Sequence, residues 1–503
     1  MKPVLFDTAD ATSDNSKSAV ENTTGTHTWA NPGFVKSGTF RLQFTGTADP
    51  VAGGAQIVLE SAESNVFTIS PGTPTKLTFK SLGSLSVNSR GAFGTTPVVQ
   101  ILDANDNLVR ADSTTTSITI VAESSSANEI DGSVAGDFIT GNTATASSGE
   151  FSFPNLRVGA AAGSYTLKIK SMVTTLANPP TTSVSGAFTL TGGAVAKLAL
   201  TTEAAGAAAG KSFTTQPVVE IQDADGNKVM PVNAQIQMSS ADAEVFNTAT
   251  ITTSNGVARF DSVSANQRVG LRGTVGSKTI KFSLVSDTTI NVSQSGLQLV
   301  AGDVSRLGVT VQPQNTTAGV AFGTTVKVGV QDAWGNAVSS ATAITPSLVD
   351  AVTRNALADT TSSSANTDSE GVATFTGMKF NRAGNVRIKF DSGTGLATFS
   401  DAFTIAVAAP HKITWVTDPD LQITNRATIS TAPVAELRDE FDNLVSSGYS
   451  ATATLGTTNA SNVSSLTNAT RTAVGGKFTF NSMVLGAKTG TYRFVITSIT
   501  VTQ

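Results

Sequence analysis

The chain is 503 residues long, too long for a single hydrophobic core, and its apolar fraction of 39% argues against disorder. Only 14% of its residues are charged and the net charge is -4, without a run of Lys and Arg, so the sequence does not favour nucleic-acid binding. The lack of cysteine removes disulfides, thiol chemistry and thiolate metal sites.

Residues 1–72 are predicted to form a small β-rich head. Apolar and polar residues alternate in Thr39–Thr45, as in a half-buried strand. Gly53 and Gly54 precede a second apolar stretch, so a hairpin is the expected structure. The first residues lack the apolar run of a signal peptide, and no stretch of the chain reaches the length of a membrane helix.

One phrase organises the rest of the chain and occurs four times. It consists of an apolar strand, an Asp, three residues, an Asn, and a Val two residues later. Successive Asp residues lie 120, 109 and 107 residues apart, which is the spacing of small domains and too long for a solenoid repeat. The pairs are Asp103 with Asn107, Asp223 with Asn227, Asp332 with Asn336, and Asp439 with Asn443.

Each phrase belongs to a unit that is predicted to contain about seven short strands. Apolar residues stand two and four positions before the Asp, as Val99 and Ile101 do, and the residue between them is mostly polar. This alternation is typical of antiparallel strands with one buried face. The sequence therefore predicts domains at 73–192, 193–302, 303–408 and 409–503.

Short connections join these units and favour a semi-rigid rod over a flexibly linked array. Strands of about ten residues make each unit roughly 35 to 40 Å long, so four in line would reach roughly 150 Å. In all four copies, the Asp and Asn are expected to form a tight turn in which the glycines and the Asn adopt positive φ. Tyr165 and Tyr492 match the position of a tyrosine corner, but the other two units have no such residue.

The Asp-x-x-x-Asn-x-Val turn and the strand before it resemble the bacterial immunoglobulin-like (Ig-like) repeats of invasin- and intimin-type surface adhesins. They are also similar to the repeats of tailed-phage structural proteins. The resemblance covers residues 73–503 and implies an all-β fold of tandem Ig-like β-sandwiches behind the head, arranged as an extended rod. It implies a surface structural role and leaves open which surface carries the protein.

Calcium is the one cofactor that the turns suggest, because carboxylates gather there. The candidates are Asp103, Asp106, Asp223 and Asp225, which imitate the start of an EF-hand loop. However, the loops lack the Glu that an EF-hand needs at its twelfth position, and the third and fourth copies have Trp334 and Phe441 at a ligand position. We therefore expect turn formation and no metal site or other cofactor.

The sequence offers no catalytic constellation, and we expect a protein that is not an enzyme. His27 and His411, the only histidines, lie in different domains without a Ser, Cys or His partner at motif spacing. Lys168 and Lys389 are candidate donors for an isopeptide bond to Asn or Asp, on the condition that they lie in an apolar interior.

Two functions fit these features. The first is a phage virion fibre, decoration or tail-associated protein at the virion surface, in which residues 1–72 bind other virion proteins or form a homo-oligomer and the repeats project outward. The alternative is a secreted bacterial adhesin or a surface-layer or filament subunit at the cell surface. Either could bind a host-surface glycan or protein, without membrane insertion. Only 11 residues follow Tyr492, so we expect either that the last unit lacks its closing strand or that the chain once continued.

Overall fold

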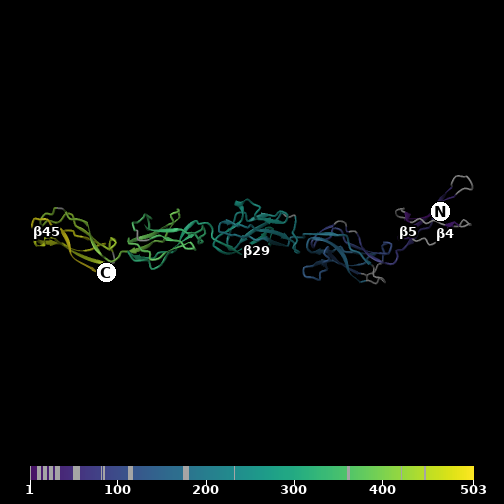
Figure 1. Cartoon of the computed structure of the whole chain (residues 1–503), viewed down its shortest axis with the longest axis horizontal. Coiled ribbons are helices and arrows are strands. Elements are labelled where there is room, and N and C mark those ends of the chain that lie inside the picture. The colour runs from purple at the N-terminus through teal and green to yellow at the C-terminus, as the bar shows by residue number, and fades with distance from the viewer. Residues whose placement is uncertain are drawn as a thin grey trace.

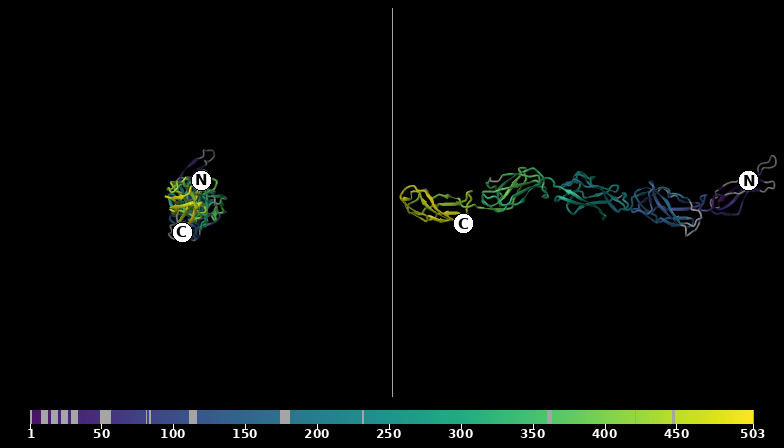
Figure 2. Two further views of the ribbon diagram at one scale, coloured as in Figure 1. Left: turned by 90° about the vertical axis from the view of Figure 1, so that its left-hand side faces the viewer. Right: turned by 60° about the horizontal axis from the view of Figure 1, so that its bottom comes forward.

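A computed structural model of the chain shows an all-β protein whose domains lie in line as an extended rod (Figure 1). Figure 2 shows the same line of domains from another side and, in its left-hand view, the domains overlapping along the long axis. The structure describes residues 2–7, 13–14, 20–21, 27–28, 34–48, 57–80, 82, 85–110, 117–173, 181–230, 233–359, 363–420, 422–446 and 449–502. The helical elements among them are two short 3-10 turns, and none of them has the length or apolar character needed to cross a membrane.

We use Ig-like 1 to Ig-like 4 as names for the ranges 73–192, 193–302, 303–408 and 409–503. In Ig-like 1, one sheet has the strand order β15-β10-β8-β18 and the facing sheet has the order β12-β11-β17-β19-β9. The bounds are β8 (Lys76–Phe79), β9 (Leu85–Asn88), β10 (Val98–Leu102), β11 (Ser117–Ser124), β12 (Glu129–Ile130), β13 (Phe138–Thr140), β14 (Thr143–Thr145), β15 (Glu150–Ser152), β16 (Arg157–Gly159), β17 (Gly163–Val173), β18 (Thr181–Thr182) and β19 (Phe188–Thr191).

Ig-like 2 has three sheets, with the strand orders β20-β22-β26, β21-β27-β24 and β25-β23-β28-β29, and the last of them ends in a long hairpin of β28 and β29. Its strands are β20 (Lys197–Thr202), β21 (Lys211–Ser212), β22 (Val218–Gln222), β23 (Gln235–Ser240), β24 (Glu244–Phe246), β25 (Thr250–Thr252), β26 (Val257–Arg259), β27 (Gly270–Arg272), β28 (Gly276–Leu284) and β29 (Asp287–Leu299).

Ig-like 3 and Ig-like 4 begin with the same three-stranded sheet, β30-β32-β35 and β39-β40-β44. The strands of Ig-like 3 are β30 (Arg306–Val311), β31 (Thr316–Thr317), β32 (Val326–Gln331), β33 (Ala343–Asp350), β34 (Ala365–Asn366), β35 (Val372–Phe375), β36 (Gly384–Asp391), β37 (Ala397–Phe399) and β38 (Phe403–Ala406). Those of Ig-like 4 are β39 (Lys412–Thr417), β40 (Val434–Arg438), β41 (Ser450–Thr457), β42 (Val463–Thr467), β43 (Thr470–Thr472), β44 (Lys477–Thr479), β45 (Val484–Ala487) and β46 (Phe494–Thr502).

Each unit has its own core, built from the alternation visible in the sequence. Val99 and Ile101 of β10 are fully buried, whereas Gln100 between them is half-buried and donates a hydrogen bond to Glu150 on the neighbouring strand. The rings of Phe188 and Phe93 pack edge to face with centroids 5.1 Å apart. Burial of such side chains is the main stabilising contribution within each sandwich.

The head shares the closing strands of an Ig-like unit. Its strands are β1 (Lys2–Asp7), β2 (Ser13–Asp14), β3 (Val20–Glu21), β4 (His27–Thr28), β5 (Gly38–Ala48), β6 (Ile57–Glu63) and β7 (Phe67–Ile69). Gly38 pairs with Ile69 and Phe40 with Phe67, in the same register in which Gly163 pairs with Leu190 and Tyr165 with Phe188. The order β2-β1-β5-β7 thus corresponds to β12-β11-β17-β19. The described head therefore continues the line of domains.

Candidate functional site at the interdomain joints

The Asp and Asn of the repeated phrase lie where each unit meets the one before it. The Asp side chain closes the turn from inside: Asp223 Oδ1 accepts hydrogen bonds from the amides of Asp225, at 2.9 Å, and Asn227, at 2.8 Å. Its Oδ2 accepts from Asn227 Nδ2, at 3.0 Å, and from the amide of Gly193 in the connection between the units, at 2.8 Å. Asp103, Asp332 and Asp439 each accept hydrogen bonds from the four equivalent donors of their own turn and connection.

These bonds stabilise the ionised carboxylate. Burial alone would raise the pKa of Asp103, but hydrogen bonds from Asn107, Gly72 and Asn105 outweigh it and hold the pKa at about 2. The pKa of Asp332 is also below its usual range for the same reason, with Gly302 and Asn336 among the donors. The charge is therefore kept inside the joint at neutral pH.

The Asn side chain then bridges to the preceding unit. Asn227 Nδ2 donates to Ala160 O at 2.7 Å, and its Oδ1 accepts from the amide of Ala162 at 2.5 Å. The other joints repeat this pair of bonds: Asn107 with Val35 and Ser37, Asn336 with Gly273 and Val275, and Asn443 with Asn381 and Ala383. The strands β5, β17, β28 and β36 each begin at a Gly, and we call the three residues before that Gly the arm, as in 160–162 before Gly163.

The expectation that the Asn residues adopt positive φ is wrong. The residue before the Asn has positive φ instead: 64° at Asp106, 88° at Gly226, 89° at Gly335 and 69° at Asp442. Glycine or a short polar residue accommodates the positive φ there. The Asn side chain has two roles in all four copies: it donates to the Asp inside the turn, and it contacts the preceding unit.

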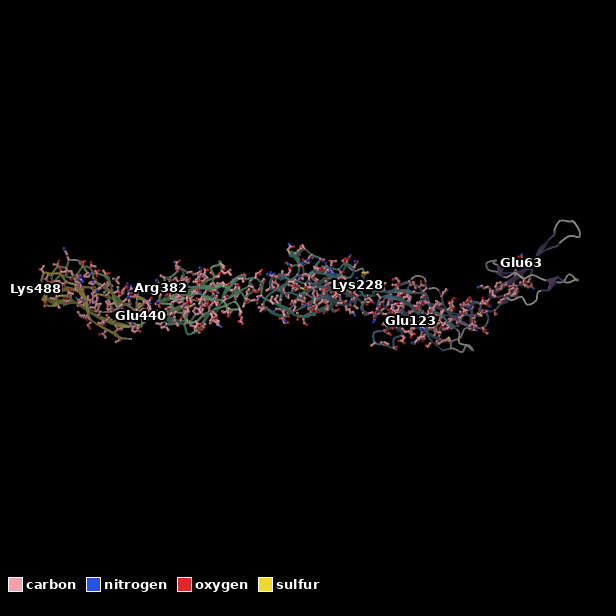
Figure 3. The ribbon with its side chains drawn as sticks, in the orientation of Figure 1. Glu63, Glu123, Lys228, Arg382, Glu440 and Lys488 are labelled. Carbon is pink, nitrogen blue, oxygen red and sulfur yellow. The ribbon has the colours of Figure 1, made fainter. Side chains whose placement is uncertain are left out.

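A tyrosine supports the arm in Ig-like 1. The Tyr165 hydroxyl donates to Ala161 O at 2.9 Å, in the middle of the arm, while its ring packs against Phe188. In Ig-like 4, the Tyr492 hydroxyl donates to Lys488 O at 2.7 Å in the same way. Figure 3 labels Arg382, in the arm of Ig-like 3 at a joint, and Lys488, in the corresponding arm at the far tip of Ig-like 4.

The residue two positions after the Asp differs between the joints and contacts a matching residue of the preceding unit. Between Ig-like 1 and Ig-like 2 it is Asp225, whose carboxylate accepts from the Ser89 hydroxyl at 2.5 Å and from Arg90 Nη2 at 2.6 Å. The Asp225 side chain is only 4% exposed. Burial raises its pKa, but the Arg90 and Ser89 hydrogen bonds lower it more, so the carboxyl stays charged.

The next two joints replace this ion pair with an aromatic ring over a glycine. A Cβ on Gly210 would lie 2.1 Å from the Trp334 ring, and a Cβ on Gly319 would lie 2.3 Å from the Phe441 ring. Both rings pack against the core of the preceding unit. Arg90, Gly210 and Gly319 occupy the same position, three residues before a core Phe, and all have positive φ. Arg426 has this position in Ig-like 4, with φ 62°.

The four candidate calcium ligands take different roles. Asp103 and Asp223 accept amide donors as described, Asp106 is ion-paired with Lys76, and Asp225 is ion-paired with Arg90. No cluster of three or more potential metal ligands occurs among the described residues. The absence of a metal site stays a prediction, and a calcium-dependent melting shift that Asp103→Asn and Asp223→Asn abolish would contradict it.

The two candidate isopeptide lysines lie outside an apolar interior. Lys168 is 42% exposed and ion-paired with Glu123 and Glu129, at 3.2 and 3.3 Å. Lys389 is 38% exposed and ion-paired with Asp391 at 2.8 Å. The condition set for an isopeptide bond is therefore not met at either lysine.

Comparison with known proteins gives structural likenesses alone. No family model and no curated protein matches the chain. Among solved structures, the Escherichia coli adhesin FdeC is similar at 16% identity and a TM-score of 0.25, covering 68% of this chain and 100% of that one. Yersinia pseudotuberculosis InvD is similar at 15% identity and a TM-score of 0.24, covering 58% and 80%.

A surface-layer protein is also among these structures. Domains 1–6 of SbsC are similar at 14% identity and a TM-score of 0.21, and the match covers all of this chain and 62% of that one.

Proposed function

We propose that the chain is a non-enzymatic structural protein that holds Ig-like domains in line as a spacer and adhesive surface. The observation that carries this proposal is the joint, which repeats the same Asp and Asn hydrogen bonds at four places along the chain. A flexible linker would let neighbouring domains rotate, whereas this joint fixes the connection to the turn and the turn to the arm.

We place this spacer at the surface of a tailed-phage virion, as a fibre, decoration or tail-associated protein. The sequence resemblance of residues 73–503 to repeats of such proteins supports the assignment. Residues 1–72 would then contact other virion proteins or further copies of the chain, and the outer units would meet a glycan or protein on the host. The proposal uses the rod for its reach and its exposed strand faces for contact.

The alternative is a bacterial adhesin or a surface-layer or filament subunit, and one observation favours it. The head pairs its strands in the register of an Ig-like unit and is joined to Ig-like 1 by the same pair of Asn side-chain hydrogen bonds as the other joints. A head of this kind extends the array of domains, as expected where many such domains stand on a cell surface.

Immunogold electron microscopy with an antibody to the chain tests the setting. Gold on purified virions, and none on envelopes of uninfected cells, is the expected result. Gold on cell envelopes with none on virions would contradict the virion assignment and support the alternative. In both cases the spacer role is tested separately, by the joint variants described in the Discussion.

A further inference from the structure

Tension along the rod passes through Ig-like 1, Ig-like 2 and Ig-like 3 in turn, because the chain enters each of them at one end and leaves it at the other (Figure 1). The entry strands β8, β20 and β30 are held alike, each antiparallel to the strand that leads into the repeated Asp. A second contact joins the segment after the entry strand to the last strand of the unit. We call this contact the clamp, and it differs between the three units.

The clamp of Ig-like 1 is a continuous ladder. Strand β9 lies parallel to β19 over four residue pairs, from Leu85 with Phe188 to Asn88 with Thr191. The Ser89 amide extends the ladder by donating to Thr191 O at 2.8 Å. Tension pulls β9 back toward the entrance and β19 forward toward the exit. Because the two strands are parallel and their bonds evenly spaced, this load shears all the bonds together.

The clamp of Ig-like 3 is shorter. Strand β31 lies parallel to β38 over two residue pairs, and the Ala318 amide extends them by donating to Ala406 O at 2.9 Å. One residue earlier, a side chain replaces the backbone: Asn315 Oδ1 accepts from the Thr404 amide at 2.8 Å. This clamp therefore shares the load among fewer bonds than that of Ig-like 1.

The clamp of Ig-like 2 is the shortest of the three. In the described part of this unit, one parallel bridge joins Ala208 to Val300. Its two hydrogen bonds run from the Ala209 amide to Val300 O, at 2.9 Å, and from the Val300 amide to Ala207 O, at 3.0 Å. The residues that would lengthen the ladder toward the entrance are paired elsewhere.

Local chain geometry explains this shortening. Ala205 exchanges both of its backbone hydrogen bonds with Thr215, at 3.1 Å each, so it faces its own hairpin and not the last strand. Gly206, at φ 66°, allows this turn, and a Cβ there would collide with the Thr214 side chain.

One buried side chain partly replaces the missing ladder. Gln294 of β29 is 7% exposed, and its Oε1 accepts from the Ala204 amide at 2.9 Å. Its Nε2 donates to Ala204 O at 2.8 Å. Gln294 thus ties the last strand of Ig-like 2 to the segment that follows the entry strand.

We propose that the rod carries tension and that Ig-like 2 is its extensible unit, which unfolds before Ig-like 3 and before Ig-like 1. This inference rests on the spacer role proposed above. Forced unfolding is governed by the unfolding rate, and a clamp with fewer bonds sharing the load yields at a lower force. Unfolding of Ig-like 2 releases roughly 350 Å of chain, at about 3.5 Å per residue, and so limits the force on the other units.

Single-molecule pulling on the full chain, held by tags at its two ends, tests the order of unfolding. Because the chain lacks cysteine, a disulfide can be placed across each clamp, where paired residues of adjacent strands are close enough to be joined. Each disulfide shortens the extension of its own unit until a reductant is added, and so identifies that unit in the trace. The three pairs are Ala208→Cys with Val300→Cys, Thr317→Cys with Ala406→Cys, and Asn88→Cys with Thr191→Cys.

Among these three units, we expect the Ig-like 2 disulfide to shorten the earliest event and the Ig-like 1 disulfide to shorten the latest. Gln294→Ala is expected to make Ig-like 2 unfold at least about tenfold faster at constant force, because two hydrogen bonds of its clamp are lost. Gln298→Ala is the matched control, since Gln298 is exposed on the same strand and donates to Gly296 O within it, at 3.3 Å. It is expected to leave the rate unchanged.

The proposal is overturned if Ig-like 1 or Ig-like 3 unfolds before Ig-like 2, or if the two Gln variants unfold at the same rate. Neither result would contradict the spacer role, because the joint variants in the Discussion test that role without unfolding a unit.

Discussion

Replacing Asn336 with Ala is expected to release the joint between Ig-like 2 and Ig-like 3. The Asn336 side chain donates to Gly273 O at 2.8 Å and accepts from the Val275 amide at 2.9 Å, both across the joint. At about 1 kcal/mol for each hydrogen bond, the docked arrangement loses about 2 kcal/mol, which is about 30-fold in the equilibrium between docked and undocked domains.

The native chain lacks cysteine, so a labelled pair can report this joint directly. Ser286→Cys in Ig-like 2 and Val352→Cys in Ig-like 3 place dyes at exposed positions on either side. We expect one narrow distribution of single-molecule energy transfer in the parent chain and a broad one after Asn336→Ala.

A matched control separates turn chemistry from the joint. Asp368 closes a similar turn inside Ig-like 3, accepting from the amides of Glu370, at 2.9 Å, and Val372, at 3.0 Å, both in its own unit. Asp368→Ala is expected to lower the stability of that unit and leave the energy transfer unchanged. An unchanged energy-transfer distribution in Asn336→Ala would contradict a role of the Asn336 hydrogen bonds in holding the joint. The fixed arrangement of the two domains would then come from Trp334 and the short connection.

Three further predictions concern the other joint residues. Arg90→Ala leaves the buried Asp225 carboxylate without its ion pair. The joint between Ig-like 1 and Ig-like 2 is therefore expected to lose about 2 kcal/mol in urea unfolding. This loss is smaller than for a fully buried ion pair because the Arg90 side chain is 39% exposed. Combining Arg90→Gly with Asp225→Trp copies the next joint and is expected to recover most of the loss, whereas no recovery would contradict the matching of these positions. Gly210→Ala, at φ 72°, drives a Cβ into the Trp334 ring and is expected to shift the Trp334 emission to the red. The control Gly377→Ala, at φ 67° with open space around it, strains the backbone equally and is expected to leave the emission unchanged. The pKa of Asp103 is lowered from 3.8 to about 2, so its ionised carboxylate contributes about 2 kcal/mol to the free energy of unfolding. This contribution is fully present above pH 4 and is lost as the pH falls toward 2. Urea unfolding across this window should show a loss of stability that Asp103→Asn removes.

Much of the fold follows from the sequence, because it depends on local patterns. Alternation places Val99 and Ile101 in the core whatever the neighbouring domain is, and the repeated Asp accepts amides two and four residues along its own chain. Such contacts depend on residues a few positions apart, so their spacing is readable. The all-β class and the tandem units rest on these patterns.

The partners across each joint were decided only by the tertiary structure. Asp225 contacts Arg90 from 135 residues away, and the turn containing Asp225 resembles the others until that contact is seen. In the sequence, Trp334 and Phe441 show only that a metal ligand is missing at this position, and the structure adds that they cover Gly210 and Gly319.

The constant Asn was the signal available in the sequence, but its hydrogen bond to the Asp inside the turn does not reveal its second contact, with the preceding unit. Its meaning depends on which surface of one domain faces the next, and no local pattern records that orientation.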